Sequence, residues 1–301
     1  MAKGSRSLNR VDTMSLFKRQ AFYFGERFII KEKEMTKRQK LILSISAVFA
    51  LFFGIVPAAN AMHIMEGYLP ANQCVIWGIL TIPFLVWGFI SIKNTVNRDR
   101  KLMTLLAMSG AFVFVLSSLK IPSVTGSCSH MTGTGLGAIL FGPAAVSILG
   151  IIVLLFQAIM LAHGGLTSLG ANTFSMAIAG PFVTFGLYKL FKSLKLNKKV
   201  SIFLAAMLGD LFTYCVTSVQ LAIAYPSEVG GVGASVIKFL GVFAPTQVPL
   251  AIVEGILTVV IVIGLESFAR PELRSLGYLE GAPVDAVEAQ IEKELKKAGE
   301  M

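Results

Sequence analysis

The strongest chemical signal in the sequence is its three histidines, His63, His130 and His163. Each stands close to the boundary of an apolar segment. Imidazole is the commonest metal ligand among side chains and suits nickel, copper, zinc and related ions. Each histidine could instead be a lone boundary residue with a backbone partner. For His163, which precedes Gly164-Gly165, that structural interpretation is favoured.

His63 differs from the other two because a processing signal precedes it. Residues 35–61 combine a basic start, a long apolar run and an A-x-A pattern at 59–61, which is typical of a signal peptide. An uncleaved first transmembrane helix would also fit the length. The small residues of the A-x-A pattern and the helix-breaking Pro57 favour cleavage. Cleavage would make Met62 the first residue of the mature chain and His63 the second.

A free amine on Met62 beside His63 predicts a chelating metal site. The α-amine of Met62, the amide nitrogen of His63 and the Nδ1 atom of its imidazole can close two fused chelate rings. These nitrogens then lie nearly in one plane, and square-planar nitrogen coordination is typical of Ni(II) or Cu(II). Low-spin Co(II) could accept the same set. His130, in a stretch without charges, is the best donor for the fourth corner.

Cys128 lies two residues before His130 and could form a ligand pair with it, but a small residue in a tight loop is the favoured interpretation. Cys128 and His163 are therefore candidates for orienting the ligands without binding the ion. Asp210 and Glu254 fall inside apolar segments. Carboxylates inside a membrane indicate function by default, but these two could equally form hydrogen bonds between helices, and the sequence does not choose.

A glycine-rich stretch at 133–137 resembles a phosphate-binding loop only superficially, because no strand is predicted before it. Small residues allow membrane helices to approach one another closely. We interpret this stretch, and the glycines around Gly164 and Gly170, as packing positions.

The composition requires a membrane around these residues. The 301-residue chain is 54% hydrophobic and 15% charged, with a mean hydropathy of +0.72, whereas about 25% of the residues of a soluble domain are charged. The net charge of +10 could suit nucleic acid, but positive loops are expected in membrane proteins and no basic stripe is interleaved with aromatic residues, so we expect no nucleic-acid partner. The three scattered cysteines predict no disulfide framework.

Six apolar segments are about as long as a hydrocarbon core of about 30 Å requires, or longer. They are residues 72–92, 101–120, 132–162, 172–191, 199–224 and 236–266. Lys and Arg concentrate at 93–101, 189–199 and 270–274, which predicts that these places are cytoplasmic. The stretches 121–131, 163–171 and 225–235 contain neither residue and should be external.

This assignment requires the segment 132–162 to enter the membrane and return, because external stretches flank it on both sides. Gly142-Pro143 is the expected break, since proline ends a helix and glycine tolerates the turn. Residues 132–142 would form a short, re-entrant arm sheltered by protein. All three histidines then lie at the external face.

We therefore predict an all-α integral membrane protein of about seven transmembrane helices, one of them short or re-entrant, after a cleaved signal peptide. Residues 1–34 precede Met35, the expected true start, and form a non-native extension. The signal peptide spans 35–61, the metal-binding membrane domain 62–270 and a cytoplasmic tail, either a short exposed helix or disordered, 271–301. The protein is expected in a bacterial cell membrane, with its mature N-terminus outside and its C-terminus inside.

Four stretches of the sequence resemble the CbiM/NikM family. They are MHIMEGYLP at 62–70, SSLKIPSVTGSCSH at 117–130, GTGLGAILFGP at 133–143 and AHGGLTSLGANTFSMAIAGP at 162–181. Members of this family are the substrate-capturing S components of energy-coupling factor (ECF) transporters, a branch of ABC importers. The resemblance implies that Met62, His63 and His130 hold the ion.

The resemblance also implies partners: a transmembrane coupling subunit (CbiQ-like), a small accessory membrane subunit (CbiN-like) and cytoplasmic ATPase subunits (CbiO-like). The chain has no Walker motif, so it is not expected to be an enzyme. No cofactor is expected; the ion is cargo, Co²⁺ for cobalamin synthesis or, as the alternative, Ni²⁺. An intramembrane metalloenzyme is disfavoured because the sequence contains no H-E-x-x-H motif. A proton-coupled carrier that uses Asp210 and Glu254 is disfavoured because no internal repeats are detected.

Overall fold

The computed structural model describes residues 63–119, 121–122 and 128–279. The predicted extension, the signal peptide, Met62 and most of the tail lie outside these residues. The chain divides into two units, 1–56 and 57–301. Every described residue belongs to the second unit.

The described residues are mostly helical, as predicted. The elements in order are α3 (Ala71–Arg98), α4 (Leu102–Ser118), β1 (Ile121–Pro122), β2 (Cys128–Ser129), α5 (Thr134–Phe141), α6 (Pro143–Met160), α7 (Leu169–Asn172), the π-helical η2 (Thr173–Ala179), α8 (Gly180–Ser193), α9 (Lys198–Ala224), α10 (Gly231–Phe268) and α11 (Arg270–Ser275). The two short strands, which pair antiparallel with Ile121 opposite Ser129, were not predicted from the sequence.

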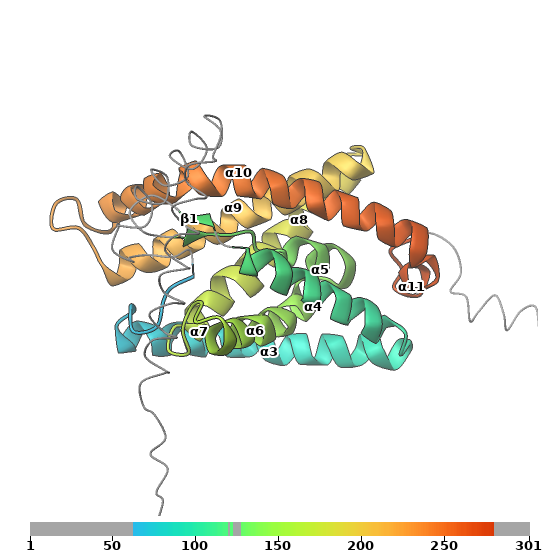
Figure 1. Cartoon of the computed structure of the whole chain (residues 1–301), viewed down its shortest axis with the longest axis horizontal. Coiled ribbons are helices and arrows are strands. Elements are labelled where there is room, and N and C mark those ends of the chain that lie inside the picture. Colours follow the sequence, from blue (N-terminus) through green and yellow to red (C-terminus); the bar gives the residue numbers. More distant parts are fainter. Residues whose placement is uncertain (1–62, 120, 123–127, 280–301) are drawn as a thin grey trace, which may run out of the picture. The chain divides into compact units, whose positions relative to one another are not determined.

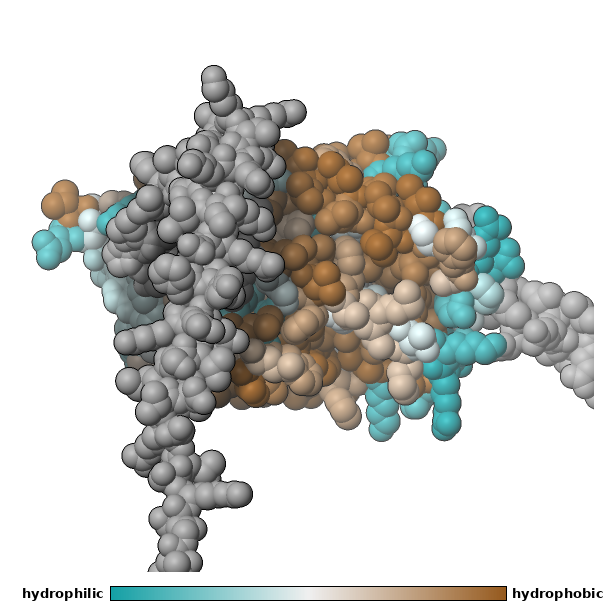
Figure 2. Space-filling view, in the orientation of Figure 1, coloured by the Kyte–Doolittle hydropathy of each residue, from teal (hydrophilic) through white to brown (hydrophobic). Residues whose placement is uncertain are grey.

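Five helices in the described part of the chain are long and apolar enough to cross a membrane: 71–98, 143–160, 169–193, 198–224 and 231–268. Helix α4 is also apolar but shorter, and α5 has only eight residues. The surface in view is largely hydrophobic over its middle and hydrophilic toward its ends (Figure 2). This is a multi-pass membrane protein. The count of seven passes, which includes α4 and α5, stays a prediction.

The predicted break at Gly142-Pro143 is present. Helix α5 ends at Phe141, Gly142 adopts a φ of 84°, and Pro143 opens α6. A positive φ costs glycine little, and proline suits the first position of a helix because no intrahelical bond is lost there. Residues 134–140 of α5 are buried against α6, α8 and α9. This short arm is therefore enclosed by protein, as the membrane interior demands of interrupted helices.

The connections rich in Lys and Arg and the connections without these residues lie at opposite ends of the helices (Figure 1). The α3–α4 turn, the α8–α9 turn and α11 lie at one end, on the right of the view. Residues 63–70, the α6–α7 loop and the α9–α10 loop lie at the other. The arrangement matches the predicted grouping of connections; which end faces the cytoplasm stays a prediction.

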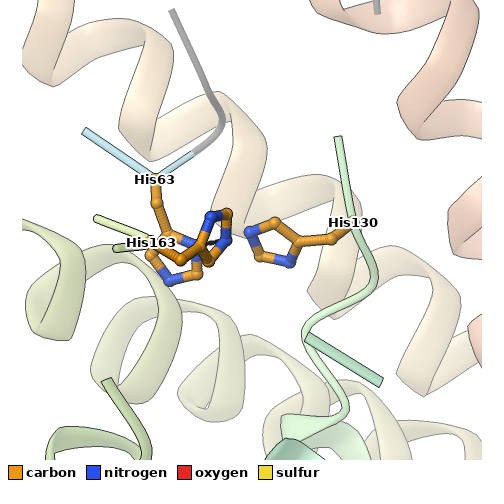
Figure 3. A group of neighbouring side chains, drawn as sticks. All are labelled: His63, His130 and His163. Atoms are coloured by element: carbon orange, nitrogen blue, oxygen red, sulfur yellow. Dashed lines mark hydrogen bonds between the residues drawn. The ribbon is translucent and has the colours of Figure 1, made fainter. Parts of the chain in front are cut away.

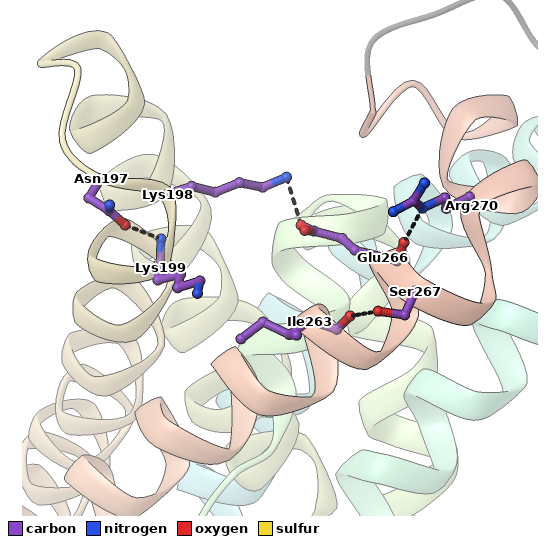
Figure 4. Close-up of polar contacts among 7 residues, drawn as sticks. All are labelled: Asn197, Lys198, Lys199, Ile263, Glu266, Ser267 and Arg270. Atoms are coloured by element: carbon purple, nitrogen blue, oxygen red, sulfur yellow. Dashed lines mark hydrogen bonds and ion pairs between the residues drawn. The ribbon is translucent and has the colours of Figure 1, made fainter.

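An ion pair joins α9 and α10 at the end of the helices where Lys and Arg concentrate (Figure 4). Lys198 at the start of α9 pairs with Glu266 near the end of α10 at 2.7 Å, and Asn197 caps α9 by accepting the amide hydrogen of Lys199. Both members of the ion pair are partly exposed, so its contribution to stability is small. The beginning of the expected exposed tail is instead packed, because Leu273 of α11 is fully buried in the hydrophobic core.

Candidate metal site

The fold brings His63, His130 and His163 together, and we refer to these residues as the three-histidine site (Figure 3). His63 precedes α3, His130 follows β2, and His163 lies between α6 and α7. One nitrogen of each imidazole lies within 4.8 Å of the others. The residues are 3%, 0% and 3% exposed, in the same order. Three buried imidazoles pointing toward one another form a nitrogen donor set suited to a transition metal.

Nδ1 of His63 and Nε2 of His163 are 2.9 Å apart. Without an ion, this distance corresponds to a hydrogen bond between the rings. Two nitrogens about 2.0 Å from one ion and at right angles around it would be about 2.8 Å apart. The same spacing therefore suits adjacent ligands of a square-planar or octahedral ion. Nδ1 of His63 is also the atom that the predicted chelate requires.

The backbone selects the tautomer of His130. Its Nδ1 lies 2.8 Å from the carbonyl oxygen of Met131. A carbonyl can only accept, so Nδ1 carries the hydrogen and donates it. A neutral ring then has its lone pair on Nε2, which is the arrangement of a metal-binding imidazole oriented by a backbone carbonyl. The His130 ring stacks on that of His63, with centroids 4.3 Å apart.

The residue next to His63 is held by Asn172 at the end of α7. The amide of Ile64 donates to Asn172 Oδ1 at 2.8 Å, and Asn172 Nδ2 donates to the carbonyl of Ile64 at 3.0 Å. Ser168 Oγ donates to the same carbonyl. These bonds satisfy both backbone groups of Ile64 and fix the chain where His63 enters the site.

The glycines of the α6–α7 loop let the N-terminal segment lie directly against it. A Cβ atom on Gly165 would lie 2.5 Å from the Cα of Glu66, so only glycine fits without movement. The Glu66 carboxylate accepts the amide hydrogen of Thr167 at 3.1 Å, and the Gly67 amide donates to Thr167 Oγ1. Hydrogen bonds from the side chain and the backbone of Thr167 lower the pKa of Glu66.

On the other side of the site, α9 and α10 hold the segment that carries His130. Gln247 Nε2 donates to the carbonyl of His130 at 3.1 Å and to Asp210 Oδ2 at 2.6 Å. The amide of Thr132 donates to Glu254 Oε2 at 2.6 Å and lies 3.2 Å from Asp210 Oδ1. Asp210 and Glu254 thus form hydrogen bonds between helices, one of the two roles that the sequence left open.

Of the predicted site residues, Met62 lies outside the described residues, and Cys128 forms part of β2 with its backbone opposite Pro122. The structure places His163 against His63, although the sequence favoured a separate boundary residue. Neither Asn172 nor Gln247 was predicted from the sequence. A buried amide inside an apolar segment is the signal that could have identified both.

A family model described as the cobalt uptake substrate-specific transmembrane region (CbiM) matches residues 63–273 of this chain. A relative from Lachnoclostridium phytofermentans named cobalt transport protein CbiM is 74% identical over 247 residues, which cover 82% of this chain and 99% of the relative. A protein of the same name from Chlorobium limicola is 60% identical over 240 residues, which cover 79% of this chain and 94% of the relative.

Two solved structures share the fold. A truncated transition metal transporter is 30% identical, with a TM-score of 0.59, over 68% of this chain and 98% of that one. A second transition metal transporter is 31% identical, with a TM-score of 0.58, over 68% of this chain and 92% of the other.

Proposed function

Because this chain belongs to the CbiM family of cobalt uptake transmembrane regions, we propose that it is the substrate-binding membrane component of an ECF-type importer that captures Co²⁺. Ni²⁺ is the alternative cargo for the same site. The observation that carries the proposal is the convergence of three buried imidazoles at the three-histidine site.

In this proposal the mature N-terminus supplies most of the ligands. The Met62 amine, the His63 amide and Nδ1 of His63 form the chelate, and Nε2 of His130 completes the square. The contact of Met131 with Nδ1 of His130 supports this choice of donor atom, because it leaves the lone pair on Nε2. In the loaded site the ion would take the lone pair of His63 Nδ1, and His163, whose Nε2 lies 2.9 Å from that atom, would stand beside the ion.

Cobalt is preferred over nickel because the relatives from Lachnoclostridium phytofermentans and Chlorobium limicola are named cobalt transport proteins. The ligand set alone does not separate the ions, since both accept planar nitrogen donors. Competition between Co²⁺ and Ni²⁺ for the purified mature protein measures the preference directly. Tighter binding of Ni²⁺ would favour the alternative cargo.

The importer requires further subunits, because this chain contains no Walker motif. We propose a transmembrane coupling subunit, a small accessory membrane subunit and cytoplasmic ATPases as partners. After capture, ATP hydrolysis by the partners would reorient this chain and release the ion inward. The short arm α5 packs against other helices of the chain and not against lipid.

Metal titration of a variant with one alanine inserted between Met62 and His63 tests the site. The insertion adds a second amide nitrogen to the chelate and moves His63 by one residue. The amine, two amides and His63 could then fill the square without His130, so we expect a changed affinity and a changed visible spectrum of the Ni²⁺ or Co²⁺ complex. Met62→Ala is the matched control, because it keeps the amine and the chelate and should bind like the parent. Equal affinity and identical spectra in the insertion variant and the parent would refute the proposed site.

A further inference from the structure

Helix α10 carries a row of polar side chains along residues 129–132, the segment that presents His130. Thr246 Oγ1 lies 2.7 Å from Ser129 Oγ, and Gln247 binds the carbonyl of His130. Two turns further along, Glu254 binds Thr132. Between them, Met131 contacts Leu250 of α10 in a buried apolar cluster. All four residues of the segment therefore contact α10, three through hydrogen bonds and Met131 through apolar packing.

Gln247 is placed so that both hydrogens of its amide are used. Nε2 donates one to the carbonyl of His130 and the other to Asp210 Oδ2. Since a carbonyl only accepts, the amide cannot be turned around without losing its bond to His130. Gln247 therefore links the backbone of His130 to Asp210 in a fixed orientation.

Asp210 and Glu254 complete the link through Thr132. Glu254 accepts from the Thr132 amide at 2.6 Å and from its hydroxyl at 2.9 Å. Asp210 approaches the same amide, with 3.2 Å between its Oδ1 and the nitrogen of Thr132. The two carboxyl groups are 1% and 0% exposed, and no Lys or Arg among the described residues pairs with them.

Such a network is not needed for stability as such. A buried carboxyl group loses its hydration, and replacing buried charged groups with apolar ones of similar size is often neutral or stabilising. Each of these hydrogen bonds ends on residues 130–132 or on a neighbour that contacts them. The arrangement therefore orients this segment, in the way that groups behind a metal ligand fix its direction.

We propose that Gln247, Asp210 and Glu254 are positioning residues, which hold the backbone of residues 130–132 so that Nε2 of His130 reaches the ion as the fourth nitrogen. The inference rests on the proposed function and extends it to residues that do not touch the ion. It accounts for carboxyl groups in the membrane interior that the capture site itself does not use.

The test is Gln247→Met in the mature full-length chain loaded with Ni²⁺. Methionine matches the length of glutamine but donates no hydrogen bond. The N-terminal chelate stays intact, while an oxygen of water replaces the fourth nitrogen. We expect affinity to fall about 10–100-fold and the visible absorption band to move to longer wavelength, as in His130→Ala. Glu254→Gln, which can still bind both donor groups of Thr132, should keep more of the parent spectrum than Glu254→Leu.

Two comparisons separate positioning from general damage. Thr258→Val is the matched control, because Thr258 is buried on the same helix and its hydroxyl binds only the helix backbone. The double variant His130→Ala/Gln247→Met should bind no more weakly than His130→Ala alone, since both act through one ligand. Additive losses of affinity would overturn the inference.

Failure of this inference and failure of the proposed function give different results. If the alanine insertion leaves binding unchanged, the proposed function fails. If the insertion changes the affinity and spectrum while Gln247→Met keeps those of the parent, the capture site stands and the positioning role is wrong. Should Glu254→Leu fail to fold, Gln247→Met and Glu254→Gln still decide the question.

Discussion

At the scale of single residues, His163 contacts His63, the histidine of the proposed chelate. Its Nε2 lies 2.9 Å from Nδ1 of His63, and its own amide is bound to the carbonyl of Gln157 at the end of α6. His163 is therefore anchored to a helix rather than to the N-terminal segment. Since the proposed ion binds Nδ1 of His63, the imidazole of His163 would stand beside that ion.

We therefore expect His163→Ala to weaken Co²⁺ or Ni²⁺ binding about 10–100-fold without abolishing it, because the chelate and His130 remain. Isothermal titration of the purified mature protein measures the change. Ser193→Ala, at the exposed end of α8, is a control far along the chain from the site. Parent-like affinity in His163→Ala would show that the imidazole beside the chelate does not contribute to binding.

Glu66 gives the N-terminal segment a dependence on pH. Hydrogen bonds from Thr167 lower its pKa, so the folded form prefers the ionised carboxylate more than the unfolded chain does. A lowered pKa contributes stability above the unfolded value, about 4.3, and that stability is lost as pH falls through the folded value. The parent should therefore exceed Glu66→Gln in melting temperature at pH 7.

This difference should shrink as the pH falls below about 4. Thermal unfolding of both proteins at a series of pH values measures it. The difference is expected to be small, because Glu66 is exposed to solvent. A difference in melting temperature that is independent of pH would indicate that Thr167 does not favour the ionised carboxylate.

At the scale of elements, the α6–α7 loop and residues 63–67 depend on each other for their placement. Gly165→Ala places a Cβ atom 2.5 Å from Glu66 Cα and 2.6 Å from its amide nitrogen, both of which are backbone atoms that cannot rotate away. We expect the N-terminal segment to shift from the loop and metal affinity to fall at least about tenfold. Metal titration, with circular dichroism to check the helices, tests this expectation.

Gly186→Ala is the matched control, because Gly186 of α8 has open space where the Cβ atom would lie. It should bind metal like the parent. If Gly165→Ala also binds like the parent, the close approach of the loop to Glu66 does not position His63.

The elements also show what a sequence can and cannot predict. The break at Gly142-Pro143 was predictable because the chemistry of both residues is local. The hydrogen bonds between Asn172 and the backbone of Ile64 were not predictable, since the two residues are 108 positions apart and nothing local to either indicates the partner. The pairing of His163 with His63 is similarly remote, at 100 positions. Contacts of this kind arise from tertiary packing.

At the scale of the whole molecule, the pattern of loop charge grouped distant connections correctly. Three connections that contain Lys or Arg in quantity lie at one end of the helices, and the segments that carry the histidines lie at the other (Figure 1). The pattern acts at this scale because charge cannot readily enter the hydrocarbon core, whatever the details of packing. It could not supply the distances within the three-histidine site, which depend on single side chains.

The proposed capture mechanism depends on removal of the predicted signal peptide, since only a free amine on Met62 could close the chelate. The family match begins at residue 63, directly after the predicted new N-terminus. Ala61→Leu replaces the small residue that signal cleavage requires at the last position of the A-x-A pattern. We expect mass spectrometry of the membrane protein to find upstream residues retained, and metal binding to fall because the amine donor is missing. Asn60→Ala, at the tolerant middle position, should be cleaved and bind normally; full binding by an uncleaved chain would exclude the amine as a ligand.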